Sequence, residues 1–231
     1  MNGSRLVLLA AAALQPAAAA AASANESVYL EFLWEARPPH SIARQQTIQF
    51  LTDGQHLHQI CVATDLADTD VRGLMLKAFD ASGREISSHR YPEYRGAKQC
   101  YGADLGQSGA PGLWTFQAQT GDGRTGESTI QVNAKLEDSP LSTDPGTPYV
   151  VGRPNYDASI PPDQWRGRLV WDMTVDAQGT VTNVSVVTAE GVGLKLRDRA
   201  IAAGYLSLFF PDKQRENTPL VWRRELSFAP E

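Results

Sequence analysis

Short segments of alternating apolar and polar residues recur along positions 28 to 132, and this pattern limits the fold more than any other feature of the sequence. The segments follow one another at intervals of roughly 8 to 15 residues and are separated by turns rich in Gly, Asp and Ser. A period of two residues is typical of a strand that buries one face. No helical period interrupts the series. We therefore predict about seven or eight strands that pack as a β-sandwich.

The expected strands include one clear hairpin and one strand with a strongly apolar face. Leu74–Phe79 and Glu85–His89 flank the turn signal Asp80–Gly83, which predicts two antiparallel strands. Trp114 and Phe116 share one face with Ala118, because alternate residues of a strand point the same way. The full set of expected strands in this part is Tyr29–Leu33, Ile48–Leu51, His58–Ala63, Leu74–Phe79, Glu85–His89, Gln99–Ala103, Gly112–Thr120 and Ser128–Val132.

A Pro-rich segment interrupts this pattern. Pro140, Pro145 and Pro148 stand among Ser, Thr, Asp and Gly, with almost no apolar period. Segments of this composition act as semi-extended spacers. We therefore predict a β-sandwich domain at 25–133, a linker at 134–152 and a second domain at 153–231.

The second domain has a different pattern, in which strands and a helix are combined. Leu169–Val175 and Val181–Val187 flank a turn that contains Gly179, and this predicts another hairpin. Leu196, Ala200 and Ala203 then recur at helical spacing, and Ile201 widens the apolar stripe. Leu220, Trp222, Leu226 and Phe228 lie on one face of a last strand. The order strand, strand, helix, strand predicts a small α+β unit.

Two resemblances to known families follow from these residues. The second domain resembles the C-terminal domain of TonB, the energy transducer of the bacterial envelope. The run Ala110–Phe116 is similar to the penultimate strand of bacterial immunoglobulin-like domains. Together they imply a two-domain chain, an all-β immunoglobulin-like sandwich followed by a TonB C-terminal-like α+β domain. The TonB-like features are Tyr156, Gly167 with Val170, the hairpin Val175-Asp176-x-x-Gly179-x-Val181, Val184, Val186, Gly191, the helix Leu196-x-Asp198-Arg199-Ala200-Ile201, Phe210-Pro211 and the strand that ends at Phe228.

The TonB resemblance implies a function for the last strand. In that family this strand lies at a sheet edge and pairs with an extended segment of an outer-membrane transporter, which is β-strand addition. Arg223 and Arg224 would favour an acidic partner segment, or they would only prevent edge-to-edge aggregation. The residues implied to bind a partner are Leu220, Val221, Trp222, Arg223, Arg224, Glu225 and Leu226.

Residues 1–24 predict a cleaved signal peptide. Arg5 is a short positive region, Leu6–Leu14 is apolar, and Ala22-Ser23-Ala24 is a small-residue cleavage pattern. The stretch is mostly Ala and is broken by Gln15 and Pro16, so it is a poor membrane span. We therefore expect a periplasmic protein, exported through the inner membrane of a Gram-negative bacterium. If the segment is kept as an anchor instead, the TonB resemblance would imply an energy transducer of TonB-dependent transport.

The two cysteines are expected to form a structural disulfide. Export to an oxidising compartment, an even count and the lack of histidine partners at metal spacing favour a Cys61–Cys100 bridge over two separate buried thiols. The lack of a Cys-x-x-Cys motif argues against a redox-active pair. Closing this loop is worth about 4 kcal/mol at most. The immunoglobulin-like resemblance implies that the bridge joins neighbouring strands of one sheet rather than the two sheets.

The sequence offers several weak candidates for chemistry. Ser108 stands in a Gly-x-Ser-x-Ala turn and not in a nucleophile elbow. His56 and His58 would share one strand face, but no third metal ligand accompanies them. Asp172 is expected on the outer face of a strand and Asp176 in a turn. A last candidate, the acidic loop of Asp65, Asp68 and Asp70, does not have calcium-loop spacing.

These observations predict a protein that is not an enzyme and has no cofactor or metal. The net charge of −5 and the pI near 5.4 argue against a nucleic-acid partner. We expect envelope proteins as partners, and after cleavage no membrane span. Rival hypotheses are a decoy in TonB-dependent uptake, a scaffold of the envelope, and a cell-wall hydrolase or hydrolase inhibitor, which would need a polar cleft in the sandwich.

Overall fold

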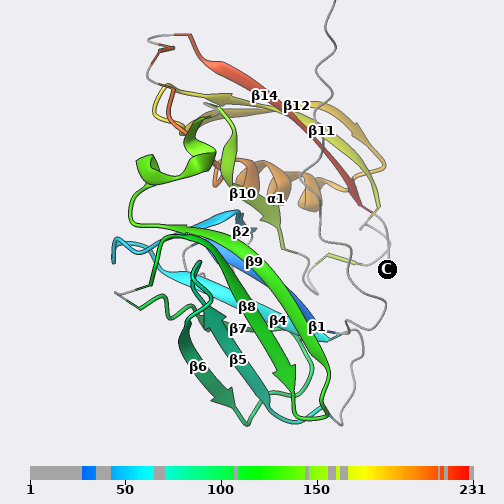
Figure 1. Ribbon diagram of the computed structural model, residues 1–231. Helices are drawn as coiled ribbons and strands as arrows, with labels where there is room; N and C mark the ends of the chain where they lie inside the picture. The colour runs from blue at the N-terminus through cyan, green and yellow to red at the C-terminus, as the bar shows by residue number, and fades with distance from the viewer. Residues whose placement is uncertain are drawn as a thin grey trace, which may run out of the picture.

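The computed structural model consists of three β-sheets, one α-helix and two short 3₁₀-helices in the residues that it describes (Figure 1). These are residues 28–34, 43–64, 71–106, 109–143, 146–155, 160–161, 166–212, 214–215 and 218–228. The signal peptide predicted at 1–24 lies outside them. None of the helices in these ranges combines the length and the apolar character that a membrane crossing requires.

The strands form sheets that we name A, B and C. Sheet A has the order β13 (Leu208–Phe209), β10 (Pro148–Pro154), β2 (Ala43–Thr47), β1 (Val28–Trp34), β4 (His58–Thr64) and β7 (Gln99–Gly102). Sheet B has the order β3 (Gln49–Leu51), β9 (Thr125–Asn133), β8 (Gly112–Thr120), β5 (Leu74–Phe79) and β6 (Glu85–Tyr91). Sheet C has the order β12 (Val181–Glu190), β11 (Gly167–Val175) and β14 (Leu220–Phe228). The helices are η1 (Leu136–Asp138), η2 (Pro140–Thr143) and α1 (Leu194–Gly204).

Sheet B packs against the β1, β4 and β7 side of sheet A, as the sequence predicts for a sandwich. The core between them is rich in aromatic side chains: the ring of Phe32 lies 5.6 Å from that of Phe50 and 5.5 Å from that of Phe116. Trp114 and Phe116 are buried on the same face of β8, which confirms the predicted alternation. The hairpin of β5 and β6 is also confirmed, because the N–H of Gly83 donates to the carbonyl of Asp80 across the turn.

The other side of sheet A joins the two parts of the chain. β10 pairs with β2 from Val150 opposite Thr47 to Pro154 opposite Ala43. The predicted linker therefore differs from the structure over 148–152, which is strand rather than spacer. The sequence pattern does not indicate β10, because this strand begins at a proline, is only seven residues long and contains Gly152. β2, a run of mainly polar residues, was likewise not predicted.

Helix α1 lies between β10 and β2 on one side and sheet C on the other (Figure 1). Leu196 and Ala200 are fully buried in the core that α1 shares with sheet C. At the opposite side of the helix, a Cβ added to Gly152 would lie 1.8 Å from the carbonyl oxygen of Ala203. Only glycine lets β10 and the end of α1 approach this closely.

A separate apolar cluster joins the sandwich to β10 and to the segment that follows α1. Trp34 and Leu51 of the sandwich pack there with Tyr149 and Val150 of β10, and with Phe210. The rings of Trp34 and Tyr149 meet edge to face with centroids 5.5 Å apart. The sandwich and the C-terminal part are therefore packed together through apolar side chains as well as through a shared sheet.

The C-terminal part contains the predicted two strands, helix and last strand as β11, β12, α1 and β14, but an additional strand, β13, lies between α1 and β14 and pairs with β10 in sheet A. Gly179 has φ +86° in the β11–β12 turn, as the sequence predicts. Asp176 stabilises the same turn, because its Oδ1 accepts hydrogen bonds from the backbone N–H groups of Gln178 and Thr180. Gly204 is the last residue of α1 and faces Val184 of β12.

Candidate partner-binding strand

β14 is an edge strand of sheet C. It pairs with β11 over nine consecutive residue pairs, from Gly167 opposite Phe228 to Val175 opposite Leu220, without a register shift. Among the described residues, no strand pairs with the opposite side of β14. The other edge strand, β12, pairs with β11 through two register shifts. Bulges and other irregularities hinder the addition of another strand to a sheet edge. β14, the more regular of the two edge strands, is therefore the better place for an added strand.

The outer face of β14 carries charges that are already paired within sheet C. The guanidinium of Arg223 donates to both carboxylate oxygens of Asp172, at 2.7 and 2.8 Å. Arg168 binds Glu225 in the same bidentate way, at 2.5 and 2.8 Å. These hydrogen bonds lower the pKa values of both carboxyl groups and raise those of both arginines. Arg223 therefore has a carboxylate partner inside the protein, which weakens the expectation that it selects an acidic segment.

The inner face of β14 is apolar and only partly covered. Leu220, Trp222 and Leu226 are half-buried against the core beneath sheet C. The indole ring of Trp222 meets Phe209 edge to face, with centroids 5.6 Å apart. An incoming strand that pairs with β14 would place alternate side chains beside this row, where apolar groups would become buried.

Arg224 interrupts this apolar row. Its guanidinium lies 5.9 Å from the centre of the Trp171 ring, and its Nη1 donates to the carbonyl oxygen of Gly152 at 2.8 Å. Burial, together with the nearby charge of Arg153, lowers the pKa of Arg224 to about 10. The two arginines of the last strand thus differ: Arg223 closes an ion pair on the outer face, whereas Arg224 reaches the edge of β10.

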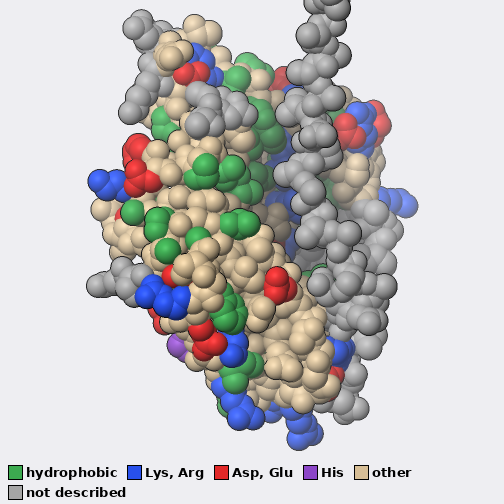
Figure 2. Space-filling view, viewed as in Figure 1, with side chains coloured by type: hydrophobic (Ala, Val, Ile, Leu, Met, Phe, Trp, Pro, Cys, Tyr) green, Lys and Arg blue, Asp and Glu red, His purple; other side chains and the backbone are tan. Residues whose placement is uncertain are grey.

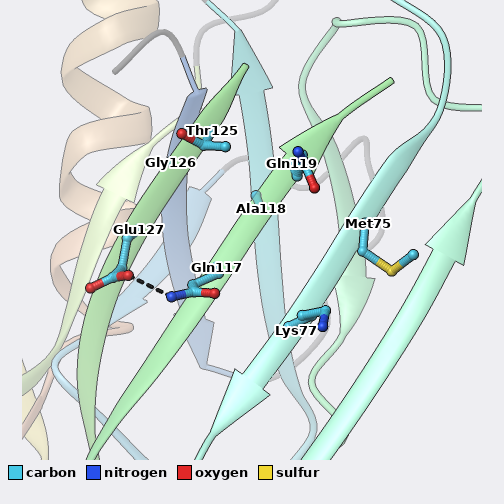
Figure 3. Close-up of a pocket in the computed structure, with 8 residues that line it drawn as sticks. All are labelled: Met75, Lys77, Gln117, Ala118, Gln119, Thr125, Gly126 and Glu127. Atoms are coloured by element: carbon cyan, nitrogen blue, oxygen red, sulfur yellow. Dashed lines mark hydrogen bonds between the residues drawn. The ribbon is translucent and has the colours of Figure 1, made fainter. Parts of the chain in front are cut away.

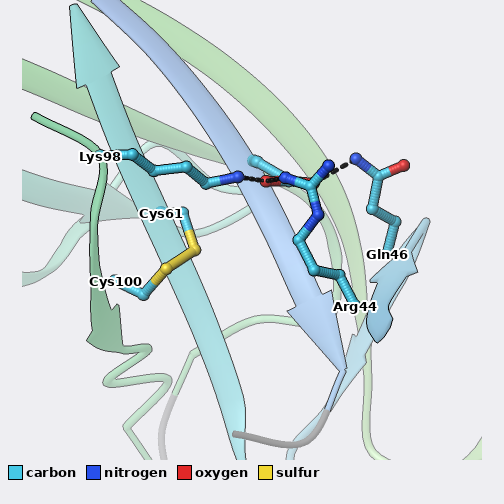
Figure 4. Close-up of a disulfide and its surroundings, with 6 residues drawn as sticks. Arg44, Gln46, Cys61, Lys98 and Cys100 are labelled. Carbon is cyan, nitrogen blue, oxygen red and sulfur yellow. Dashed lines mark hydrogen bonds and ion pairs between the residues drawn. A yellow bond between two sulfur atoms is a disulfide. The ribbon is translucent and has the colours of Figure 1, made fainter. Parts of the chain in front are cut away.

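The predicted disulfide is present and lies at the β7 edge of sheet A. Cys61 of β4 and Cys100 of β7 are directly opposite each other on neighbouring antiparallel strands, and their sulfur atoms are bonded (Figure 4). Cys61 is buried and Cys100 is exposed. This confirms both the pairing and the expectation that the bridge stays within one sheet.

Glu31 organises the polar surface beside the disulfide. Its carboxylate accepts hydrogen bonds from Arg44 and Gln46, both on β2, and from Lys98, which directly precedes β7 (Figure 4). Burial alone would raise the pKa of Glu31, but the hydrogen bond from Lys98 and the charge of Arg44 outweigh it and lower the pKa. Every charge in this group has a partner, so the group is best explained as a structural network across β1, β2 and β7.

His56 and His58 do not form a metal site. His56 lies before β4 and its Nδ1 is 3.0 Å from the carboxylate of Asp53. His58 is buried, and its Nε2 is 3.0 Å from the backbone nitrogen and 3.1 Å from the carbonyl oxygen of Leu51. The described residues include no group of three His, Cys, Asp or Glu side chains that could hold a metal ion.

Burial of His58 predicts a pH-dependent stability. The loss of hydration on burial lowers the pKa of His58 to about 4. Among the neighbouring charged groups, His56 lowers this pKa further and Asp53 raises it. Between pH 6.5 and 4 the unfolded chain therefore binds a proton that the folded chain does not, and stability falls as the pH falls. We expect urea unfolding to show a loss of about 2 kcal/mol between pH 7 and pH 5.

The matched control for this loss is a second histidine on the surface. His58→Gln should remove most of the pH dependence, while His89→Gln, which changes an exposed residue, should retain it. An equal pH dependence in wild type and His58→Gln would show that other groups cause it.

A shallow depression of about 550 Å³ lies on the outer face of sheet B (Figure 3). Its one carboxylate among the described lining residues is Glu127, whose Oε2 accepts a hydrogen bond from Gln117 at 2.8 Å. Lys77 at its rim is paired with Glu85. Hydrolysis of a glycan by acid and base groups usually needs two carboxylates that face each other, so this lining does not favour a hydrolase. The lining residues are Met75, Lys77, Gln117, Ala118, Gln119, Thr125, Gly126 and Glu127.

The remaining sequence candidates do not form a joint site in the described part of the chain. Asp172 lies on the outer face of β11 and Asp176 in the following turn, as predicted, and each has its own hydrogen-bond partners. The other candidates lie outside the described residues: Ser108, Asp65, Asp68, Asp70 and Tyr156.

Comparison of the sequence with protein-family models and with curated proteins finds no match in either set. The geometry of β14 and its neighbours is therefore the basis for assigning a function. Sequence reasoning found this strand through its alternating apolar residues but missed its contact with β10. The apolar run Tyr149-Val150-Val151 was the one signal for β10.

Proposed function

We propose that this protein is a non-enzymatic periplasmic binding module that accepts an extended segment of an envelope protein along β14. The observation that carries the proposal is the regular, nine-residue pairing of β14 with β11 beside an edge that no described strand occupies. Backbone N–H and C=O groups on such an edge can pair with an added strand, and side chains then select the partner. A TonB-dependent outer-membrane transporter is one source of such a segment.

Two further features support this assignment. Apart from β13, which pairs in sheet A, the C-terminal part follows the strand, strand, helix, strand order of the TonB C-terminal-like pattern, and the two packed sheets A and B are compatible with an immunoglobulin-like module before it. The Cys61–Cys100 bridge suits an oxidising compartment such as the periplasm. Because β10 belongs to sheet A and contacts α1, a partner held at β14 would be carried in a defined orientation to the sandwich.

Site-specific photo-crosslinking tests the proposal. A benzoylphenylalanine is placed at Val221 on β14 or at Val187 on β12, two exposed valines on the two edge strands of the same sheet. In Gram-negative cells that export the protein, irradiation should produce an adduct with an envelope protein from position 221 but not from 187. Mass spectrometry should place the crosslink in an extended segment of the partner. Adducts from Val187 alone, or from neither position, would contradict binding at β14.

A further inference from the structure

Arg224 is a cation in a desolvated position without an anion to match it. In the described part of the chain its one hydrogen bond is to the carbonyl oxygen of Gly152, and no carboxylate pairs with it. Arg153, the residue of β10 that follows Gly152, is exposed to solvent and adds a second positive charge nearby. Desolvated charges without a counter-charge are unfavourable, and a carboxylate brought to this place would be stabilised.

Three other arginines, one on sheet A and two on sheet C, contrast with Arg224 because each pairs with a carboxylate. Arg168 and Arg223 bind Glu225 and Asp172 on the outer face of sheet C, and Arg44 binds Glu31 on sheet A. Figure 2 shows Lys and Arg side chains gathered in a recess of the molecule at the height where α1 and β10 lie in Figure 1. Arg224 and Arg153 thus place two positive charges near each other beside Gly152 of β10.

We propose that the segment bound by β14 carries an aspartate or glutamate opposite Arg224, with an apolar residue two positions before it and two positions after it. This inference rests on the proposed function and adds the chemistry of the partner. Residues that are directly opposite in paired strands have Cβ atoms about 4.5 to 5.5 Å apart, within reach of a guanidinium and a carboxylate. The two apolar residues would lie beside Trp222 and Leu226, the neighbours of Arg224 on the inner face.

The residues between these three positions carry less selectivity. They would point to the outer face of sheet C, beside Arg223 and Glu225, whose charges are neutralised by Asp172 and Arg168. A charged residue at either of these positions of the partner would lie beside the Arg223–Asp172 and Arg168–Glu225 ion pairs, and not beside an arginine without a carboxylate partner. The recognised pattern is therefore apolar, any residue, acidic, any residue, apolar.

Three labelled peptides test this pattern against the full-length mature protein. Each has the sequence Thr-Val-Thr-Xaa-Thr-Val-Thr, with Glu, Gln or Lys at the central position. Fluorescence anisotropy should show that the Glu peptide binds about tenfold more tightly than the Gln peptide, and the Lys peptide more weakly still. Equal affinity for all three, or no binding by any, would overturn the inference.

Variants of the protein separate the role of Arg224 from a general effect of charge. Arg224→Gln should reduce the preference for Glu over Gln to less than about twofold. Arg153→Gln, which leaves β14 unchanged, should reduce it only in part. Arg90→Gln, an exposed arginine of β6, removes the same charge far from β14 and should keep the full preference. A preference that survives in both Arg224→Gln and Arg153→Gln would overturn the inference.

The peptide-binding and crosslinking experiments together distinguish a failure of the acidic-residue inference from a failure of the proposed function. If Val221 crosslinks an envelope protein but the peptides are bound without preference, strand addition stands and the acidic position is wrong. If a Glu preference is seen but Val221 gives no adduct, the site binds acidic strands but is not used by an envelope partner in cells. The folding of each variant is checked by its urea unfolding curve before binding is compared.

Discussion

Replacing Gly152 with valine is expected to lower the free energy of unfolding by about 3 kcal/mol, at the upper end of what overpacking usually costs. The added Cβ would fall 1.8 Å from the carbonyl oxygen of Ala203, a backbone atom that cannot rotate away. Relief would require α1 to separate from β10, and with it the hydrogen bond from the N–H of Gly152 to Ser207 Oγ would be lost. Urea denaturation followed by circular dichroism measures the loss.

Gly102→Val is the matched control for this substitution. Gly102 is also a strand glycine of sheet A, but no atom lies within 4 Å of a Cβ built there and its φ is not positive. Its replacement should change the stability by less than about 0.5 kcal/mol. If Gly152→Val were equally mild, the sandwich and the C-terminal part would behave as separately folded units joined loosely, and the shared sheet would contribute little to stability.

The strands that could be predicted from the sequence are those in which apolar residues of one face alternate with polar residues of the other. Leu74–Phe79 and Gly112–Thr120 were placed with the correct bounds, because apolar residues alternate along both and turn residues flank them. β2 escaped prediction since its buried residues include Gln45, whose side-chain amide donates to the carbonyl of Leu206. A polar side chain buried by a specific tertiary hydrogen bond has no signature in a hydropathy pattern.

The same limit applies to the last strand. Its alternation was readable, and the structure places it at a sheet edge, but the two adjacent arginines could not be distinguished by sequence. Period two puts Arg223 and Arg224 on opposite faces, yet only the fold shows that Asp172 faces the first and Gly152 the second. The pairing of side chains across strands depends on register, which composition and spacing do not determine.

The disulfide could be predicted because a chain with two cysteines leaves one intramolecular pairing to consider. Its position could be inferred only from the immunoglobulin-like resemblance, which placed both residues in one sheet. The structure adds that β7 is a four-residue edge strand that pairs with β4 alone. The bridge therefore fastens a short edge strand of sheet A that has one neighbouring strand.

Removing this bridge with Cys61→Ala and Cys100→Ala is expected to lower the free energy of unfolding by about 4 kcal/mol at most. The cross-link closes a loop with a sequence separation of 39 residues, and its loss increases the conformational entropy of the unfolded chain. In the folded protein the change should be local, because the amides of β7 would exchange faster while those of β5 and β8, in sheet B, keep their protection. Urea unfolding and hydrogen exchange measure the two effects.

A single Cys100→Ser variant separates the cross-link from the packing of the sulfur atoms. Cys100 is exposed, so its replacement removes the bridge while Cys61 keeps its buried position in β4. If the single and double variants lose the same stability, and if reduction of the wild type by dithiothreitol matches both, the cross-link itself is the cause. A loss below about 1 kcal/mol would instead mean that Lys98, bound to Glu31, and the backbone pairs of β7 with β4 already hold this edge of the sheet.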